Sequence, residues 1–162
     1  GLCYGMQLLV VEYARNVLGL SDANTVEVDS KTPHPIIDIM PDQKKKLAEN
    51  NYGGSMRLGS YPAILKKGTI AQSAYKKDET KERHRHRYEV NPEYIKQLED
   101  AGLVFSATSP DGVLMEIAEL SKKTHPFHLG TQFHPEFQAR PFSPHPLFTA
   151  FVKAAIKRRG EK

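Results

Sequence analysis

The first five residues, GLCYG, constrain the fold of this chain more than any other segment. They place Cys3, the only cysteine among 162 residues, between Gly1 and Gly5 and directly ahead of an apolar helical pattern. The spacing Gly-x-Cys-x-Gly is typical of a nucleophile elbow, in which a strand turns sharply into a helix and presents one side chain at the turn. The sequence therefore predicts an α/β fold with a thiol presented at a strand-to-helix junction.

The composition indicates a single globular domain or a large part of one. Hydrophobic residues make up 39% and charged residues 26% of the chain, and no apolar run or leader pattern suggests a membrane span or a signal peptide. A single cysteine excludes an internal disulfide and fits a reducing, cytoplasmic setting. The net charge of +4 comes largely from scattered lysine clusters, which are more typical of solvated faces than of a nucleic-acid site.

The apolar periodicity and the turn residues predict alternating helices and strands. Helices are expected at residues 4–18, 92–101 and 147–158. Strands are expected at residues 55–65, 68–75, 83–90, 103–108, 113–120 and 127–133, with a short extended piece in 21–28 and a loop over 29–54. This order favours a layered mixed sheet flanked by helices, with an antiparallel portion in the middle.

The segment QFHPEF near the other end of the chain offers a base for the thiol. His134 and Glu136 are two residues apart in a segment expected to be extended, so their side chains should project to the same side. A carboxylate beside an imidazole fixes its tautomer and stabilises the imidazolium form. Cys3, His134 and Glu136 are therefore the predicted catalytic triad of a thiol-dependent acyl transfer.

Four segments together carry a resemblance to a known family: GLCYGMQ, GGSMRLG, ERHRHRYEVNP and QFHPEFQARPFSPHPLF. Over essentially its whole length the chain resembles the class I (triad) glutamine amidotransferase domain of the CTP synthase family. The resemblance implies that Cys3 attacks the side-chain amide of glutamine and forms a thioester, with His134 as base and acid and Glu136 orienting it. The ammonia would pass to a separate synthetase domain, where ATP-activated UTP becomes CTP.

The resemblance also implies which residues bind glutamine. Glu27 matches the acidic residue that faces the α-ammonium group, and Arg87 matches the arginine that receives the α-carboxylate. The backbone N–H of Tyr4, which follows the nucleophile, would be one oxyanion donor. Tyr4 itself stands where the family usually has a small aliphatic residue. The other residues expected to line this turn are Gly5, Met6 and Gln7.

Further expectations follow from the resemblance alone. No cofactor is expected in this domain, whereas ATP and Mg²⁺ would serve the synthetase domain and GTP would act as an allosteric activator, with Arg57 or Arg83 as possible contacts. The full-length enzyme would be a homotetramer, with no nucleic-acid or membrane partner. The family's earlier strands and its glycine-rich oxyanion loop precede the cysteine elbow, so residues 1–162 are expected to be a partial domain without the synthetase domain.

Both the histidine pairs and the function of the whole chain have competing interpretations. The pairs His84-x-His86 and His125-x-x-His128 are incomplete as metal sites, so we expect structural or surface histidines and no metal. For the chain as a whole, the alternatives are another class I amidotransferase, a γ-glutamyl hydrolase, or a non-catalytic regulatory or interaction module of the same fold.

Overall fold

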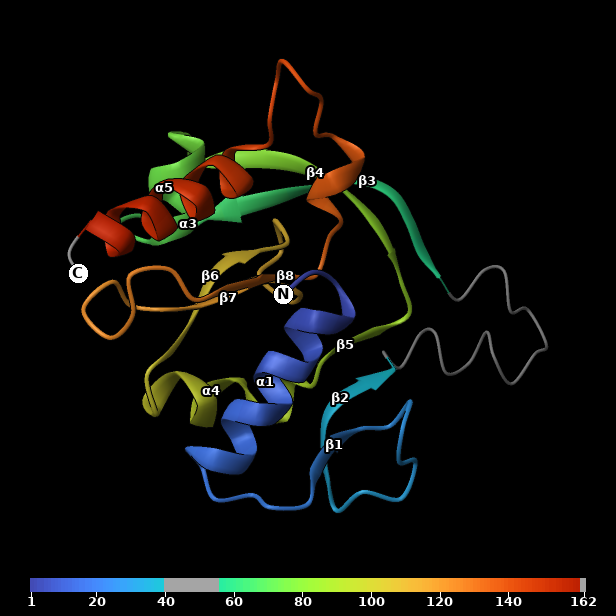
Figure 1. The fold of residues 1–162 in the computed structure, drawn as a ribbon. Coiled ribbons are helices and arrows are strands. Elements are labelled where there is room, and N and C mark those ends of the chain that lie inside the picture. Colours follow the sequence, from blue (N-terminus) through green and yellow to red (C-terminus); the bar gives the residue numbers. More distant parts are fainter. Residues whose placement is uncertain (40–55, 161–162) are drawn as a thin grey trace.

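A computed structural model describes residues 1–39 and 56–160 of the chain. It confirms the α/β class, with helices and strands alternating along the sequence (Figure 1). The elements are α1 (Tyr4–Asn16), β1 (Ala23–Thr25), β2 (His34–Ile39), β3 (Arg57–Leu65), α3 (Ile70–Tyr75), β4 (Glu79–His86), β5 (Tyr88–Val90), α4 (Pro92–Asp100), β6 (Leu103–Thr108), β7 (Met115–Leu120), β8 (Leu129–Thr131), the 3₁₀ helix η2 (Pro135–Phe137) and α5 (Pro146–Gly160).

The strands form two sheets. The larger one has the order β4-β3-β6-β7-β8 and is antiparallel throughout, and the smaller one has the order β1-β2-β5 and mixes parallel and antiparallel pairing. Only Arg87 separates β4 of the large sheet from β5 of the small one. Helices α3 and α5 pack together on one side of the larger sheet, and α1 and α4 lie on its other side (Figure 1). The predicted antiparallel middle and flanking helices are confirmed, but the strands are divided between two sheets.

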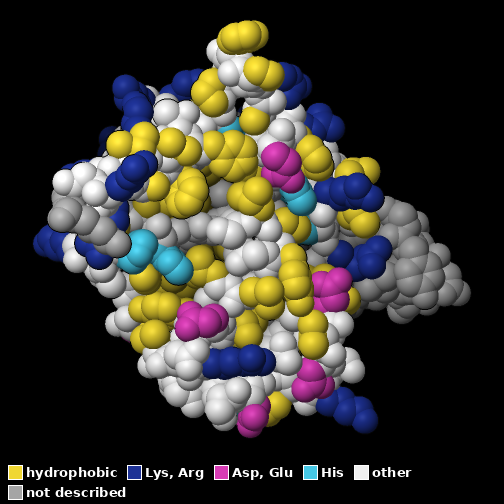
Figure 2. Space-filling model, viewed as in Figure 1, with side chains coloured by type: hydrophobic (Ala, Val, Ile, Leu, Met, Phe, Trp, Pro, Cys, Tyr) yellow, Lys and Arg dark blue, Asp and Glu magenta, His cyan; other side chains and the backbone are white. Residues whose placement is uncertain are grey.

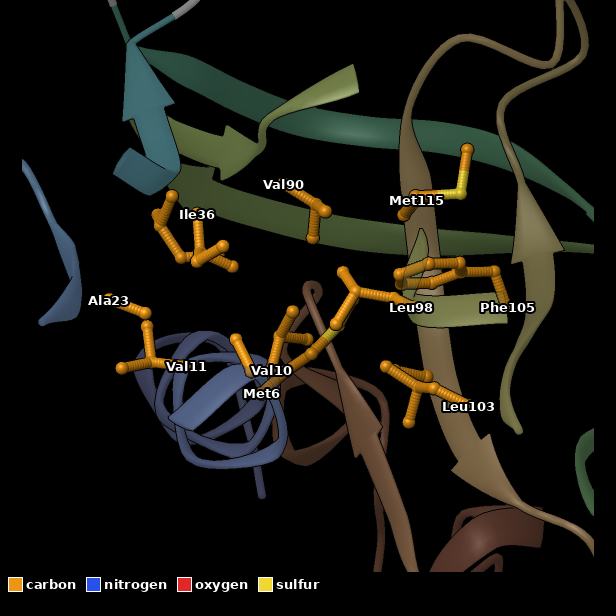
Figure 3. Close-up of a cluster of buried hydrophobic side chains, with 13 residues drawn as sticks. Met6, Val10, Val11, Ala23, Ile36, Val90, Leu98, Leu103, Phe105 and Met115 are labelled. Atoms are coloured by element: carbon orange, nitrogen blue, oxygen red, sulfur yellow. The ribbon is translucent and has the colours of Figure 1, made fainter. Parts of the chain in front are cut away.

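The larger hydrophobic core lies between α1, α4 and the strands of both sheets (Figure 3). Met6 and Val10 of α1 are completely buried there, which fits their spacing of four residues on one helix face. They meet Ile36 of the small sheet, and the same cluster includes Leu98 of α4 and Phe105 of the large sheet. Burial of this apolar area fixes α1 against both sheets and so fixes the turn from which α1 begins.

Helix α1 also approaches the backbone of β8 closely. A Cβ atom added to Gly130 would lie 2.9 Å from the Cα of Met6, so only glycine leaves room for the helix. The first turn of α1 is therefore held against β8, and the chain segment that precedes it is brought to the same place.

One predicted strand is wrong. Residues 70–75 form helix α3, because its first N–H groups find acceptors both in the preceding residue and in a carboxylate distant in the sequence. The side chain of Thr69 accepts from the N–H of Gln72, and the buried carboxylate of Glu119 accepts from the N–H groups of Ile70 and Ala71. Capping by a nearby threonine and a distant carboxylate thus outweighs the strand propensity of the segment.

The predicted loop over residues 29–54 needs a second correction. Residues His34–Ile39 form β2, which pairs with β1 on one side and β5 on the other, and its middle residues are buried. Residues 29–33 stay outside the strands, and residues 40–54 of that predicted loop, including the whole stretch PDQKKKLAENNY, lie outside the described residues.

The surface carries apolar as well as charged side chains. Figure 2 shows apolar side chains gathered across the middle and upper part of one face, with Lys and Arg side chains mostly toward its rim. The exposed large apolar residues include Leu2, Leu8, Phe142 and Phe151. Among the described helices, none has both the length and the apolar content needed to cross a membrane.

Candidate active site

Cys3 lies at the N-cap of α1 with a backbone conformation that is unusual for a residue with a side chain. Its φ is 49° and its ψ is −104°, and among the described non-glycine residues only Lys76 shares a positive φ. A Cβ on Gly1 would lie 2.4 Å from the carbonyl oxygen of Gly5, so the tight turn requires glycine at position 1. No such contact restricts Gly5, which faces open space. The predicted elbow is present, and its strain is concentrated at the cysteine.

Hydrogen bonds to β8 hold the segment before the elbow in place. The N–H of Cys3 donates to the carbonyl of Thr131 over 2.6 Å, and the N–H of Thr131 donates to the carbonyl of Gly1 over 2.9 Å. Leu2 and Thr131 form a parallel bridge between the same two segments. The thiol is therefore aligned by main-chain pairing with β8 as well as by the helix that follows.

A cavity of about 490 Å³ opens beside Cys3. Five of the predicted site residues line it, and Met56, Arg85, His86 and Tyr88 line it as well. Glu27 and Arg87 supply opposite charges to this space, as an amino acid with free α-ammonium and α-carboxylate groups requires. The predicted residues that the structure brings together here are Cys3, Tyr4, Gln7, Glu27 and Arg87.

Met6 occupies a different place from its predicted neighbours. Its side chain is completely buried in the larger hydrophobic core and does not line the cavity. The expectation that Met6 lines the site is therefore wrong for its side chain, because that side chain packs in the core beneath the elbow.

Two buried glutamine side chains lie behind the nucleophile. Gln132 follows β8, and its Nε2 donates to the sulfur of Cys3 over 3.7 Å. Gln132 Oε1 accepts from Gln7 Nε2 over 3.3 Å. Gln7 Nε2 also donates to the carbonyl of Tyr88 over 3.0 Å. Sequence reasoning found Gln7 but missed Gln132, although Gln132 stands only two residues before His134.

The thiol of Cys3 is less acidic than its place at a helix start suggests. Burial raises the pKa of Cys3 above its usual value, and the nearby carboxylates of Glu89 and Glu136 act in the same direction. Hydrogen bonds from the Tyr4 backbone and from Gln132 lower the pKa of the thiol, but their effect is smaller than that of burial. The thiol therefore needs a base to remove its proton, as the predicted pairing with His134 implies.

His134 and Glu136 form the expected imidazole–carboxylate pair. The distance from His134 Nδ1 to Glu136 Oε1 is 2.6 Å, and the ring of Phe137 stacks on the imidazole with centroids 4.9 Å apart. The backbone is not extended here, because η2 follows directly after His134 and folds Glu136 back toward it. With Nδ1 engaged, Nε2 is the ring nitrogen left to exchange a proton.

The sulfur and the imidazole are not joined directly in this structure. Among the described residues, no hydrogen bond links Cys3 to His134, although Glu136 is near enough to influence the pKa of Cys3. Catalytic hydrogen bonds are often long before substrate binds, so this arrangement is compatible with a triad.

A buried charged network extends from the cavity into the large sheet. Arg57 Nη2 donates to Glu116 Oε1 over 2.7 Å, and His84 Nε2 lies 3.4 Å from the other oxygen of Glu116. His84 Nδ1 lies 2.9 Å from His86 Nε2, and His86 Nδ1 lies 3.4 Å from Glu89. In β4 these histidines are buried, whereas Arg83 and Arg85, which alternate with them, are exposed.

Burial keeps three members of this network neutral, namely His84, His86 and Glu89. It lowers the pKa of His84 to about 2 and that of His86 to about 3, with the charge of Arg57 acting in the same direction. Burial also raises the pKa of Glu89 to about 8, although Arg57 opposes the change. Within the described residues, no cluster of three or more His, Cys, Asp or Glu side chains is arranged to hold a metal ion.

Comparisons with known proteins identify the family. Residues 1–154 match the family model described as glutamine amidotransferase class-I. The chain therefore belongs to the class I glutamine amidotransferase family. This assignment agrees with a strained cysteine at an elbow and a His–Glu pair at the end of a strand.

Within that family the chain is similar to parts of proteins named CTP synthase. It is 59% identical over 156 residues to the protein of Rubrobacter xylanophilus, covering 96% of this chain and 27% of that relative. It is 55% identical to the protein of Archaeoglobus fulgidus, covering 100% of this chain and 30% of that relative. The chain thus spans less than a third of the length of these curated relatives.

A solved structure of a related domain has the same fold. The Trypanosoma brucei CTPS glutaminase domain with bound acivicin matches this structure with a TM-score of 0.87 at 39% identity. The match covers 97% of this chain and 59% of that one. The layered α/β architecture is therefore that of a glutaminase domain.

Proposed function

We propose that this chain is the glutaminase part of a CTP synthase and hydrolyses L-glutamine through a thioester on Cys3. The observation that carries the proposal is the cavity in which the strained Cys3 lies together with Glu27 and Arg87. A thiol and two opposite charges that line one cavity match the amide and the two α-substituents of free glutamine. The names of the relatives and the acivicin-bound neighbour support the same assignment.

The proposed reaction begins with transfer of the Cys3 proton to Nε2 of His134. The thiolate attacks the side-chain carbonyl carbon of glutamine, and the backbone N–H of Tyr4 donates to the oxygen that becomes negative. His134 then gives its proton to the departing nitrogen, so ammonia leaves and the thioester remains. Glu136 holds Nδ1 and stabilises the imidazolium form between these steps.

Hydrolysis of the thioester completes the cycle. Water loses a proton to the neutral His134 and attacks the thioester carbon, glutamate leaves, and the proton returns to the sulfur of Cys3. We propose that the ammonia serves the ATP-dependent amination of UTP in a synthetase domain of the full-length protein, with Mg²⁺ acting there and GTP as an activator. A homotetrameric full-length enzyme remains part of this proposal.

The test separates the glutaminase step from the synthetase step. In the full-length protein, Cys3→Ala should abolish CTP formation from UTP and ATP when glutamine is the nitrogen donor. The same variant should still form CTP when ammonium chloride replaces glutamine. Unchanged glutamine-dependent synthesis in Cys3→Ala would overturn the assignment of the nucleophile.

A second outcome would favour one of the alternatives. If the wild-type protein releases glutamate from glutamine but forms no CTP with either nitrogen donor, the chain belongs to another amidotransferase or to a γ-glutamyl hydrolase. If it releases no glutamate under any of these conditions, the non-catalytic module is the better account.

A further inference from the structure

The nucleophile has a hydrogen-bond donor that the proposed chemistry has not yet used. Gln132 is completely buried, and its side-chain nitrogen lies 3.7 Å from the sulfur of Cys3. A buried amide that points at a sulfur stabilises the thiolate more than the thiol, because hydrogen bonds to charged groups are the stronger ones. The contact therefore favours the reactive form of the nucleophile.

The orientation of the Gln132 amide is set by its neighbour. Its oxygen accepts from Nε2 of Gln7, which can only donate, so the nitrogen of Gln132 must face the sulfur. Gln7 is fixed in turn by its bond to the carbonyl of Tyr88. The direction of the donor is thus transmitted from the backbone of β5 through two buried amides to Cys3.

The main chain holds both ends of the contact in register. The N–H of Gln132 donates to the carbonyl of Glu116 in β7, and the N–H of Cys3 donates to the carbonyl of Thr131, the residue before Gln132. The sulfur and the amide therefore belong to two paired segments whose relative shift is fixed by hydrogen bonds.

We propose that Gln132 is a positioning residue that directs a side-chain N–H at the Cys3 sulfur and holds the thiolate in place for attack. The proposal rests on the proposed glutaminase function and adds a residue that acts through the nucleophile without contacting glutamine. Gln7 fixes the orientation of the Gln132 amide and also lines the substrate cavity. Its loss is expected to have two effects, whereas loss of Gln132 should have one.

The test measures the thiol itself. In the full-length protein, the rate of alkylation of Cys3 by iodoacetamide is followed against pH by mass analysis of the peptide that contains it. Gln132→Met keeps the length of the side chain but removes the donor, and it should raise the pKa of the thiol by about one unit. The kcat/KM for glutamine at neutral pH should then fall about tenfold, with a larger change in kcat than in KM.

Two further variants make the result specific. Gln138→Met is the matched control, because Gln138 donates to Lys81 and Glu82 and has no contact with Cys3, so its thiol pKa should equal that of the wild type. Gln7→Met leaves Gln132 in place without its orienting partner and should raise the thiol pKa by a smaller amount. This second measurement keeps the proposal testable if Gln132→Met does not fold.

The outcomes separate this inference from the proposed function. A thiol pKa that is unchanged in both Gln132→Met and Gln7→Met overturns the positioning role, whatever the activity of the wild type. A wild type that hydrolyses no glutamine overturns the proposed function instead. The thiol titration needs no turnover, so the two failures are distinguishable.

Discussion

Cys3 combines a strained backbone with a sulfur that burial keeps protonated. The positive φ presents the side chain at the turn, whereas desolvation and two nearby carboxylates raise its pKa. A nucleophile in this state depends on its surroundings for activation, through a base that takes the proton and donors that stabilise the thiolate. At the scale of single residues, we therefore expect reactivity to depend on His134 and Gln132 as much as on the elbow.

The carboxylate of Glu136 should matter for rate and not for stability. Glu136→Gln removes the negative charge that holds Nδ1 of His134, and kcat for glutamine hydrolysis should fall about a hundredfold or more. Because the side chain is exposed, the midpoint of urea unfolding should stay near that of the wild type. Wild-type kcat in Glu136→Gln would contradict the role of the pair.

Arg87 should matter for binding. Arg87→Met removes the cation proposed to receive the α-carboxylate, and KM for glutamine should rise about 10- to 100-fold, as expected for a lost charge-assisted hydrogen bond. Arg158→Met is the control, since Arg158 is exposed on α5 and does not line the cavity. Steady-state kinetics in which both variants behave alike would remove Arg87 from the substrate site.

Among the elements, the close contact between α1 and β8 positions the site. Met6 rests against the backbone of Gly130, and the segment before the elbow pairs with Thr131 of the same strand. Strand β8 then leads through Gln132 to His134, so one short strand aligns the nucleophile, its donor and its base. The site depends on this junction more than on either element alone.

A side chain at position 130 should disturb that junction. Gly130→Ala places a Cβ about 2.9 Å from the Cα of Met6, so α1 must shift, at a cost of about 1–3 kcal/mol in the free energy of unfolding. Glutamine hydrolysis should fall as well, because Cys3 moves with the helix. Gly160→Ala, where a Cβ meets no atom within 4 Å, should show neither effect in urea melts and activity assays. A Gly130→Ala protein with wild-type stability would contradict this packing argument.

The sequence predicted those elements that depend on contacts between residues close together in the chain, and it failed where the contacts are distant. The elbow, the helix opened by Asn91-Pro92 and the pairing partner of His134 depend on neighbours within a few residues, and the structure contains each of them. Helix α3 depends on Glu119, almost fifty residues further along the chain, and it was predicted as a strand. Gln132 was missed for the same reason, because its function depends on Cys3 at the other end of the sequence.

At the scale of the whole molecule, a buried network around Arg57 joins the two sheets, and burial keeps its members His84, His86 and Glu89 neutral. Glu89 in β5 lies 3.8 Å from Arg57 in β3 and 3.4 Å from His86 in β4. Burial outweighs the attraction of Arg57, so the carboxyl of Glu89 has a pKa of about 8 instead of its usual 4.5. The cavity wall beside Cys3 is therefore supported by buried groups whose ionisation would lower the stability of the folded protein.

The contribution of Glu89 to stability should consequently depend on pH in a defined direction, opposite to that of His84 and His86, whose lowered pKa values favour folding as the pH rises toward 6.5. The folded protein retains a proton on Glu89 that the unfolded chain releases above pH 4.5, so the contribution of this group to stability falls as pH rises from 4.5 to about 8. Glu89→Gln mimics the protonated form, and its stability relative to the wild type should increase across this interval. Glu93→Gln, at an exposed carboxylate of α4, should follow the wild type in thermal melts. A constant difference between Glu89→Gln and wild type from about pH 5 to 8 would contradict the neutral network.

The most direct measurement of the central claim is covalent labelling of the nucleophile by a glutamine analogue. The full-length protein is treated with 6-diazo-5-oxonorleucine, with and without excess glutamine, and the adduct is located by peptide mass analysis. We expect one adduct on Cys3 that glutamine suppresses and that Cys3→Ala lacks. If Cys3 stays unlabelled while iodoacetamide still alkylates it, the thiol is accessible but does not belong to a glutamine site, and the account is contradicted.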